Sequence, residues 1–122
     1  MFTIGYDYLE LANAATGLEF PKSREQSDIT AERILMLARA YNIREGMHPL
    51  QDDVLPERTH TEPLTYGERK GSIYPKEKFK EDRDKWYHIR GCDSNGIPTK
   101  ERLTELGLGF AAHELERIGV YD

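Results

Sequence analysis

"WYHIRGCDSNGIPTKERLTELGL", residues 86–108, predicts the central feature of the fold, a pair of helices joined by a tight turn. Gly91 ends a charged helix that we expect over about 76–90, because glycine reaches left-handed backbone angles without steric cost. The letters "DSNG" that follow are typical of a turn. Thr99 then offers a side-chain cap to a short helix that runs through Leu106.

The pattern predicts further helices on both sides of this stretch. One covers about residues 6–16 and ends at Gly17, and a second begins near Ser23. There "SREQ" has the form of a capping box, with Gln26 placed to reach back to a free amide. A closing amphipathic helix ends before Gly119. We see neither strand alternation nor an internal repeat, so we expect a mostly α fold, an irregular multi-helical bundle forming a single helical segment over 1–122.

Helical spacing of the apolar residues predicts which side chains face the core. Along the chain, these are Tyr8, Leu11 and Ala15; Ile34, Leu37, Ala38 and Tyr41; Phe79, Trp86 and Ile89; and Ala111, Leu115 and Ile118.

A proline-rich connection is expected over about 46–75. It contains Pro49, Pro56, Pro63 and Pro75, and a helix cannot run through that spacing. A loop of this length is unusual inside a compact domain, and it makes sense if the segment lies against other protein surface.

Composition excludes several classes of function. Of the 122 residues, 38% are hydrophobic and 32% charged, and the formal net charge is −5. No basic stripe is present, which argues against nucleic-acid binding. A single cysteine fits a reducing compartment, and neither a signal peptide nor a membrane-spanning run is evident. We expect a soluble, cytoplasmic chain without a membrane partner.

Cys92 raises the question of a thiol or metal site. His88 lies four positions earlier, but Gly91 interrupts the helix between them and spoils the register. A zinc site would need further ligands, and no CxxC or HExxH motif occurs. We favour a packed thiol.

Other candidate ligands have plain explanations. A calcium loop beginning at Asp93 would need glycine in place of Pro98 and glutamate in place of Thr104. The proline-rich connection gathers five polar side chains without metal-site spacing, as solvated loops commonly do: His48, Asp52, Asp53, His60 and Glu62. The residues taken alone contain no catalytic constellation.

Five short motifs in order carry a resemblance to a known family. They are "NAATGLEF" (13–20), "ERILMLARAYNIREG" (32–46), "DDVLPERTHTEPL" (52–64), the opening stretch (86–108), and a closing helix. The order resembles the C-terminal end of the tungsten-dependent aldehyde ferredoxin oxidoreductases, which typically show NxREG, LPxR with PL, and RGWDxxGxPT before LxxLGL. The match runs across nearly all of the chain.

The resemblance implies the last part of the family's helical third domain. It also implies a parent enzyme that oxidises aldehydes to carboxylic acids at a tungstopterin and passes electrons through a [4Fe-4S] cluster to ferredoxin. Cys92 stands where the family usually has Trp, so the cluster cysteines do not map onto it. They and the pterin-binding motifs are expected upstream, which leaves no catalytic, cofactor or metal residue in this chain.

The remaining motif residues are expected to brace loops. Arg44, Glu45 and Arg58 suit charge-assisted hydrogen bonds, and Arg90 is placed to tie its helix end to the turn carrying Asp93.

Our leading hypothesis is therefore a helical cover for the cofactor domains of such an enzyme, supplied by the same chain or by another subunit. The alternative is a stand-alone helical interaction module that has lost the enzyme, with self-association left open. A thiol enzyme using Cys92 and His88 comes last.

Overall fold

The computed structural model describes residues 7–17 and 23–121, with side chains from Leu11 onward. The described residues form seven helices and no β-strand, which confirms the mostly α prediction. The helices are α1 (Asp7–Thr16), α2 (Arg24–Arg44), α3 (Pro49–Asp52), α4 (Arg58–Thr61), α5 (Lys76–Arg90), α6 (Lys100–Glu105) and α7 (Gly109–Arg117).

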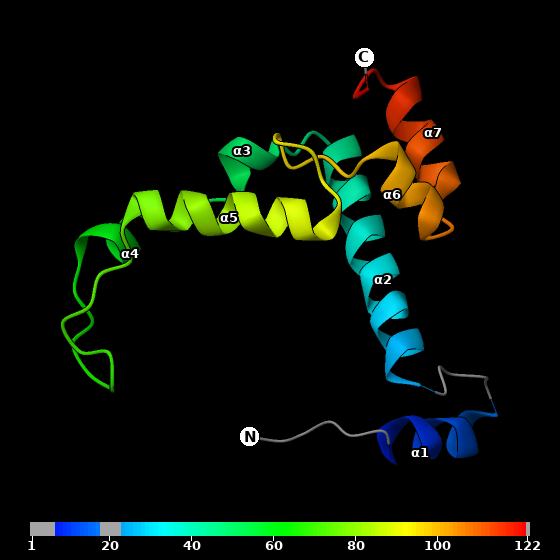
Figure 1. Ribbon diagram of the computed structural model, residues 1–122, viewed down its shortest axis with the longest axis horizontal. Coiled ribbons are helices and arrows are strands. Elements are labelled where there is room, and N and C mark those ends of the chain that lie inside the picture. Colours follow the sequence, from blue (N-terminus) through cyan, green and yellow to red (C-terminus); the bar gives the residue numbers. More distant parts are fainter. Residues whose placement is uncertain (1–6, 18–22, 122) are drawn as a thin grey trace.

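Helix α2 is the axis of the fold. In Figure 1 the C-terminal end of α5 meets α2 in the C-terminal half of α2, and α6 and α7 lie beside the same half. Helix α1 lies beyond the other end of α2, and the segment around α4 projects away from the rest. The core is therefore confined to one end of the longest helix.

The predicted helix ends are confirmed. The Ser23 hydroxyl accepts a hydrogen bond from the Gln26 amide, and the Thr99 hydroxyl accepts one from Arg102. Gly91 has a φ of 74° at the end of α5, and the Cys92 amide donates to the Tyr87 carbonyl at 2.9 Å to close that end. Beyond it, Cys92 and Pro98 form an isolated antiparallel bridge that closes the turn.

The proline-rich connection is less irregular than expected. A proline at or near the first position of a helix costs no hydrogen bond, because the amide that it lacks has no partner within the helix. Pro49 accordingly begins the single turn of α3, and the single turn of α4 follows Pro56. The proline-rich connection over 46–75 therefore contains two single helical turns, and residues 62–75 form a loop.

The core is small and differs from the predicted one. It contains Met36, Ala40, Ile43, Tyr87, Cys92, Leu103, Leu106, Leu108, Ala111, Ala112 and Leu115. The inward positions predicted on α2 are wrong, since Ile34, Leu37, Ala38 and Tyr41 all face outward. Helix α2 has a second apolar face, and α5, α6 and α7 pack on the other one.

Predictions for the other helices are mixed. Ala111 and Leu115 are buried as expected, but Ile89 and Ile118 are exposed. Trp86 packs against the core and Phe79 is half-buried. Leu11 and Ala15 are exposed, and the side chain of Tyr8 lies outside the described residues.

The chain exposes far more surface than a compact protein of its size. Its accessible area is 9472 Å² for 14.1 kDa. The size scaling for compact monomers gives roughly 6,700 Å². The difference reflects a helical scaffold with most of its length outside the core.

Candidate functional site

The best-built polar site surrounds Arg39, the one buried charged side chain among the described residues. Its Nε donates to the Gly96 carbonyl at 2.7 Å, and its Nη2 donates to Asp53 Oδ2 at 2.6 Å. The guanidinium also lies over the rings of Trp86 and Tyr87, with centroids 5.2 and 5.1 Å away. Arg39 thus joins α2, the segment after α3, α5 and the turn after α5.

Two neighbours complete this Arg39 cluster. The Tyr87 hydroxyl donates to the same Asp53 Oδ2 at 2.8 Å, so one carboxylate oxygen accepts from two helices. Gly96 has a φ of 78°, and a Cβ there would lie 2.5 Å from Tyr87 Cζ and 2.7 Å from Arg39 Nη2. Only glycine allows the turn to approach this closely.

The protonation states of the Arg39 cluster indicate a clamp rather than an acid–base pair. Burial lowers the pKa of Arg39, but the hydrogen bond and charge of Asp53 outweigh it and the net direction is upward. Burial and then the Asp53 hydrogen bond raise the pKa of Tyr87 to about 12. Both donors stay protonated at neutral pH, and neither is poised to exchange a proton.

A second group of charged contacts, the Glu32 node, surrounds Glu32 two turns earlier on α2. Glu32 pairs with Arg90 at the end of α5 and, at 3.3 Å, with Arg102 of α6. Glu32 and Arg39 are seven residues apart, so they fall on the same side of α2. Together they fix α5 and α6 to this helix.

The predicted bracing arginines act differently from our expectation. Arg90 pairs with Glu32 and not with the following turn, where Asp93 Oδ1 accepts from the Asn95 and Ile97 amides. Arg44 pairs with its neighbour Glu45 at the surface and so joins no separate loops.

Arg58 also fails to brace a loop. It lies 3.8 Å from Glu62 at the surface, within the same short segment, and both side chains are exposed. The real braces, Arg39 and Glu32, lie within the motif "ERILMLARAYNIREG", but their bracing role was not predicted. A charged residue between apolar neighbours in "LMLARAY" was the available signal.

Cys92 is buried in the core, as predicted. Burial is the largest effect on its thiol and raises its pKa, against a smaller lowering effect of nearby Arg39. A nucleophilic or metal-binding cysteine needs the thiolate. His88 is exposed on α5 and lines one hollow with Cys92, but burial keeps the thiol in its protonated form, which is a poor nucleophile.

The polar residues of the proline-rich connection do not converge. Asp53 belongs to the Arg39 cluster, Asp52 Oδ2 accepts from the His48 amide, and His60 Nδ1 lies 2.7 Å from the Tyr74 carbonyl. Within residues 7–17 and 23–121, no group of three or more His, Cys, Asp or Glu side chains is placed to hold a metal ion. These donors therefore do not fit a pterin-bound metal or an iron–sulfur cluster.

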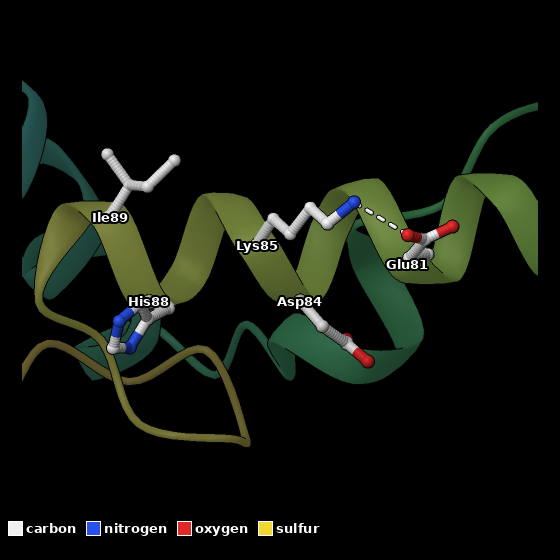
Figure 2. Close-up of a pocket in the computed structure, with 5 residues that line it drawn as sticks. All are labelled: Glu81, Asp84, Lys85, His88 and Ile89. Carbon is white, nitrogen blue, oxygen red and sulfur yellow. Dashed lines mark hydrogen bonds and ion pairs between the residues drawn. The ribbon is translucent and has the colours of Figure 1, made fainter.

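The outer face of α5 carries a shallow hollow (Figure 2). Its side chains lie along the helix without converging, and Lys85 Nζ is paired with Glu81 Oε1 at 2.6 Å. His88 and Ile89 lie at the far end. Such a surface matches a solvated helix face rather than a binding site.

A groove between α2 and α7 is lined mostly by apolar residues. Leu37, Tyr41 and Phe110 line it, with the Arg44 and Glu114 side chains at its edge, and its volume is about 180 Å³. The ring of Tyr41 carries the Arg44 guanidinium 4.7 Å from its centroid. The groove continues the outward apolar face of α2.

Comparison with known proteins identifies the family. A sequence model described as "Aldehyde ferredoxin oxidoreductase, domains 2 & 3" matches residues 3–108. The chain belongs to the aldehyde ferredoxin oxidoreductase family. This confirms the resemblance drawn from the five motifs.

Relatives and a solved structure agree with this family. Over 102 residues, the chain is 37% identical to the tungsten-containing aldehyde ferredoxin oxidoreductases of Pyrococcus abyssi and Pyrococcus furiosus. It is 34% identical over 114 residues to an "Aliphatic sulfonate oxidoreductase, WOR-like subunit" of Pyrococcus furiosus. The active site complex BamBC of benzoyl coenzyme A reductase has a similar structure, with a TM-score of 0.67 and 29% identity.

Coverage is unequal in these comparisons. The matches span 84% of this chain but 16% of the two aldehyde ferredoxin oxidoreductases, and 90% against 18% for the sulfonate enzyme. The structural match covers 96% of this chain and 16% of the other. The chain thus corresponds to about a sixth of these relatives. In the described residues, no helix is both long and apolar enough to cross a membrane.

Proposed function

We propose that this chain is the C-terminal helical cover of a cytoplasmic tungstopterin oxidoreductase that oxidises an aldehyde to a carboxylic acid and delivers electrons to ferredoxin. Residues 1–122 act as one helical segment. The chain supplies no ligand to the metal or to the cluster and instead holds the surface of the cofactor-bearing part. The observation that carries this proposal is the family match, in which this chain corresponds to about a sixth of the relatives' length.

The built sites of this chain support a structural role. The Arg39 cluster and the Glu32 node fix helices to one another, and neither presents a free acid, base or nucleophile to a substrate. The excess exposed area supports contact with a larger body. Tungsten would supply the oxygen-transfer chemistry when bound elsewhere in the assembly, and the residues described here keep their own role of packing.

The test is the metal content of the native assembly, captured anaerobically through this chain from its source cell. Tungsten and iron that co-purify in fixed ratio with this chain, together with aldehyde-dependent reduction of ferredoxin, are the expected result. A chain that purifies without either metal, alone or with copies of itself, would overturn the proposal and favour the stand-alone interaction module.

A further inference from the structure

Tyr74, just before α5, is tied at three points to residues before and after it in the chain. Its amide donates to the Thr59 carbonyl at 3.2 Å, and its carbonyl lies 2.7 Å from Nδ1 of His60. A carbonyl oxygen can only accept, so Nδ1 carries the proton and donates. The Tyr74 hydroxyl donates to Asp82 Oδ2 of α5 at 2.7 Å. These contacts, which we call the Tyr74 latch, hold α4 against the start of α5.

Aromatic and charged contacts reinforce the Tyr74 latch. The His60 ring lies 5.7 Å from the Phe79 ring and 6.4 Å from the Tyr74 ring, measured between centroids. The Tyr74 ring meets the Phe79 ring edge-on at 6.2 Å. Lys76 Nζ lies 2.9 Å from Glu57 Oε1. His60 takes part in both the hydrogen bonding and the ring packing, so the latch depends on it most.

The loop beyond the latch is closed by its own backbone. The Leu64 amide donates to the Ser72 carbonyl at 3.0 Å, and the Gly71 amide donates to the Leu64 carbonyl at 2.8 Å. The Ser72 hydroxyl donates to the Arg69 carbonyl at 2.6 Å. A compact loop whose two ends lie close together is an Ω-loop. Residues 56–76, which we call the arm, therefore form a closed unit.

The arm is separate from the core. None of its residues is buried, and none belongs to the core cluster. In the part of the chain that the structure describes, the hydrogen bonds and ion pairs of the arm all end within residues 56–82. Figure 1 shows the arm projecting away from α2, α6 and α7. Exposed contacts of this local kind open with a smaller free energy than a core does.

The chain is anchored on both sides of the arm. Asp53 precedes the arm and Tyr87 follows it, and both belong to the Arg39 cluster. The arm can therefore open while the segments that lead into and out of it stay fixed to α2.

We propose that the arm opens and closes as a unit at the Tyr74 latch, independently of the core, and that His60 keeps it closed. The closed arm holds its outer end in one arrangement, with the side chain of Tyr66 85% exposed. Opening releases that end without unfolding the helices of the core. This inference goes beyond the proposed function and does not depend on it.

The test measures amide hydrogen exchange by NMR in the full chain and in His60→Ala, with His48→Ala as the matched control. His48 is also half-buried, and its side chain does not cap α3. The amides of Leu64, Gly71 and Tyr74 report the arm, because each donates within it. In His60→Ala they should exchange about tenfold faster, which corresponds to roughly 1.4 kcal/mol of closing free energy. His48→Ala should leave their exchange unchanged.

A second measurement follows the core alone. Trp86 is the single tryptophan and packs against the core, so its fluorescence during urea denaturation reports core unfolding. His60→Ala should leave the midpoint of this transition unchanged. A midpoint lowered together with faster exchange in the arm would show that the arm and the core unfold as one unit, which overturns the inference. It is also overturned by arm amides that exchange at the free-peptide rate in the unaltered chain, or equally in both variants.

Discussion

The two halves of α2 lie in different surroundings. In residues 36–43, Met36, Arg39, Ala40 and Ile43 are buried against α5, α6, α7 and the turn after α5. In residues 24–35 none is buried, although Ile29, Ile34 and Leu35 are as apolar as the core residues. The comparison teaches that the C-terminal half of this helix is stabilised by contacts within the chain, whereas the N-terminal half leaves its few apolar side chains exposed.

Gly96→Ala should cause the largest loss of stability, because Gly96 lies against the buried half of α2. The added Cβ would occupy a left-handed backbone angle and overlap Tyr87, Arg39 and Pro49, all within 2.9 Å. The strain and the displaced Arg39 cluster should together lower the free energy of unfolding by about 4 kcal/mol. Urea denaturation measures this change.

Gly71→Ala is the matched control for that substitution. Gly71 has a φ of 85° but no atom within 4 Å of its added Cβ, so only backbone strain of about 1 kcal/mol is expected. Equal effects at the two glycines would show that the backbone angle, and not close packing at the Arg39 cluster, accounts for the loss of unfolding free energy.

Arg39→Ala is the next largest expected effect, about 3 kcal/mol of unfolding free energy. It leaves the Gly96 carbonyl without its Arg39 donor, leaves Asp53 with the Tyr87 hydroxyl but no charged donor, and removes the contacts with two aromatic rings. Arg44→Ala is the control, because Arg44 contributes a surface pair with Glu45 and a contact with the exposed Tyr41 ring. A negligible loss at Arg39 in urea denaturation would mean that the apolar core alone holds α2.

The pH dependence of the free energy of unfolding should also come from the contacts around the buried half of α2. Tyr87 has a pKa raised to about 12, chiefly by burial, against about 10 in the unfolded chain. Between pH 10 and pH 12 the unfolded state loses the hydroxyl proton first. The contribution of Tyr87 to the free energy of unfolding is therefore fully present below pH 10 and falls as the pH rises through this window.

Tyr87→Phe tests this assignment. The variant should lose about 1 kcal/mol at neutral pH with the Asp53 hydrogen bond, and its stability should then fall less steeply from pH 10 to pH 12. A remaining slope is expected from Tyr121, whose pKa burial also raises to about 12. An unchanged slope, measured by urea denaturation across this window, would contradict the assignment to Tyr87.

Local features of the fold could be predicted from the sequence. The end of α5 at Gly91 and the caps at Ser23 and Thr99 depend on residues within a few positions of one another, so their signals are contained in short stretches. The family resemblance rested on such stretches too. The packed state of Cys92 followed from the absence of partners with the right spacing.

Features that depend on distant contacts could not be predicted in this way. Arg39 bonds a carbonyl 57 residues away, and nothing near it in the sequence marks Gly96 as its acceptor. The buried face of α2 was wrongly assigned because the helix has two apolar faces, and periodicity cannot choose between them. The choice depends on which face α5, α6 and α7 meet.

The smallest expected effect concerns the exposed half of α2. Ile34→Gln in the isolated chain should change the free energy of unfolding by less than about 0.5 kcal/mol, because the side chain is already in water. Met36→Gln, two residues later and fully buried, is the matched variant and should cost about 3 kcal/mol in the same urea denaturation. A large loss at Ile34 would mean that its face is already packed within this chain.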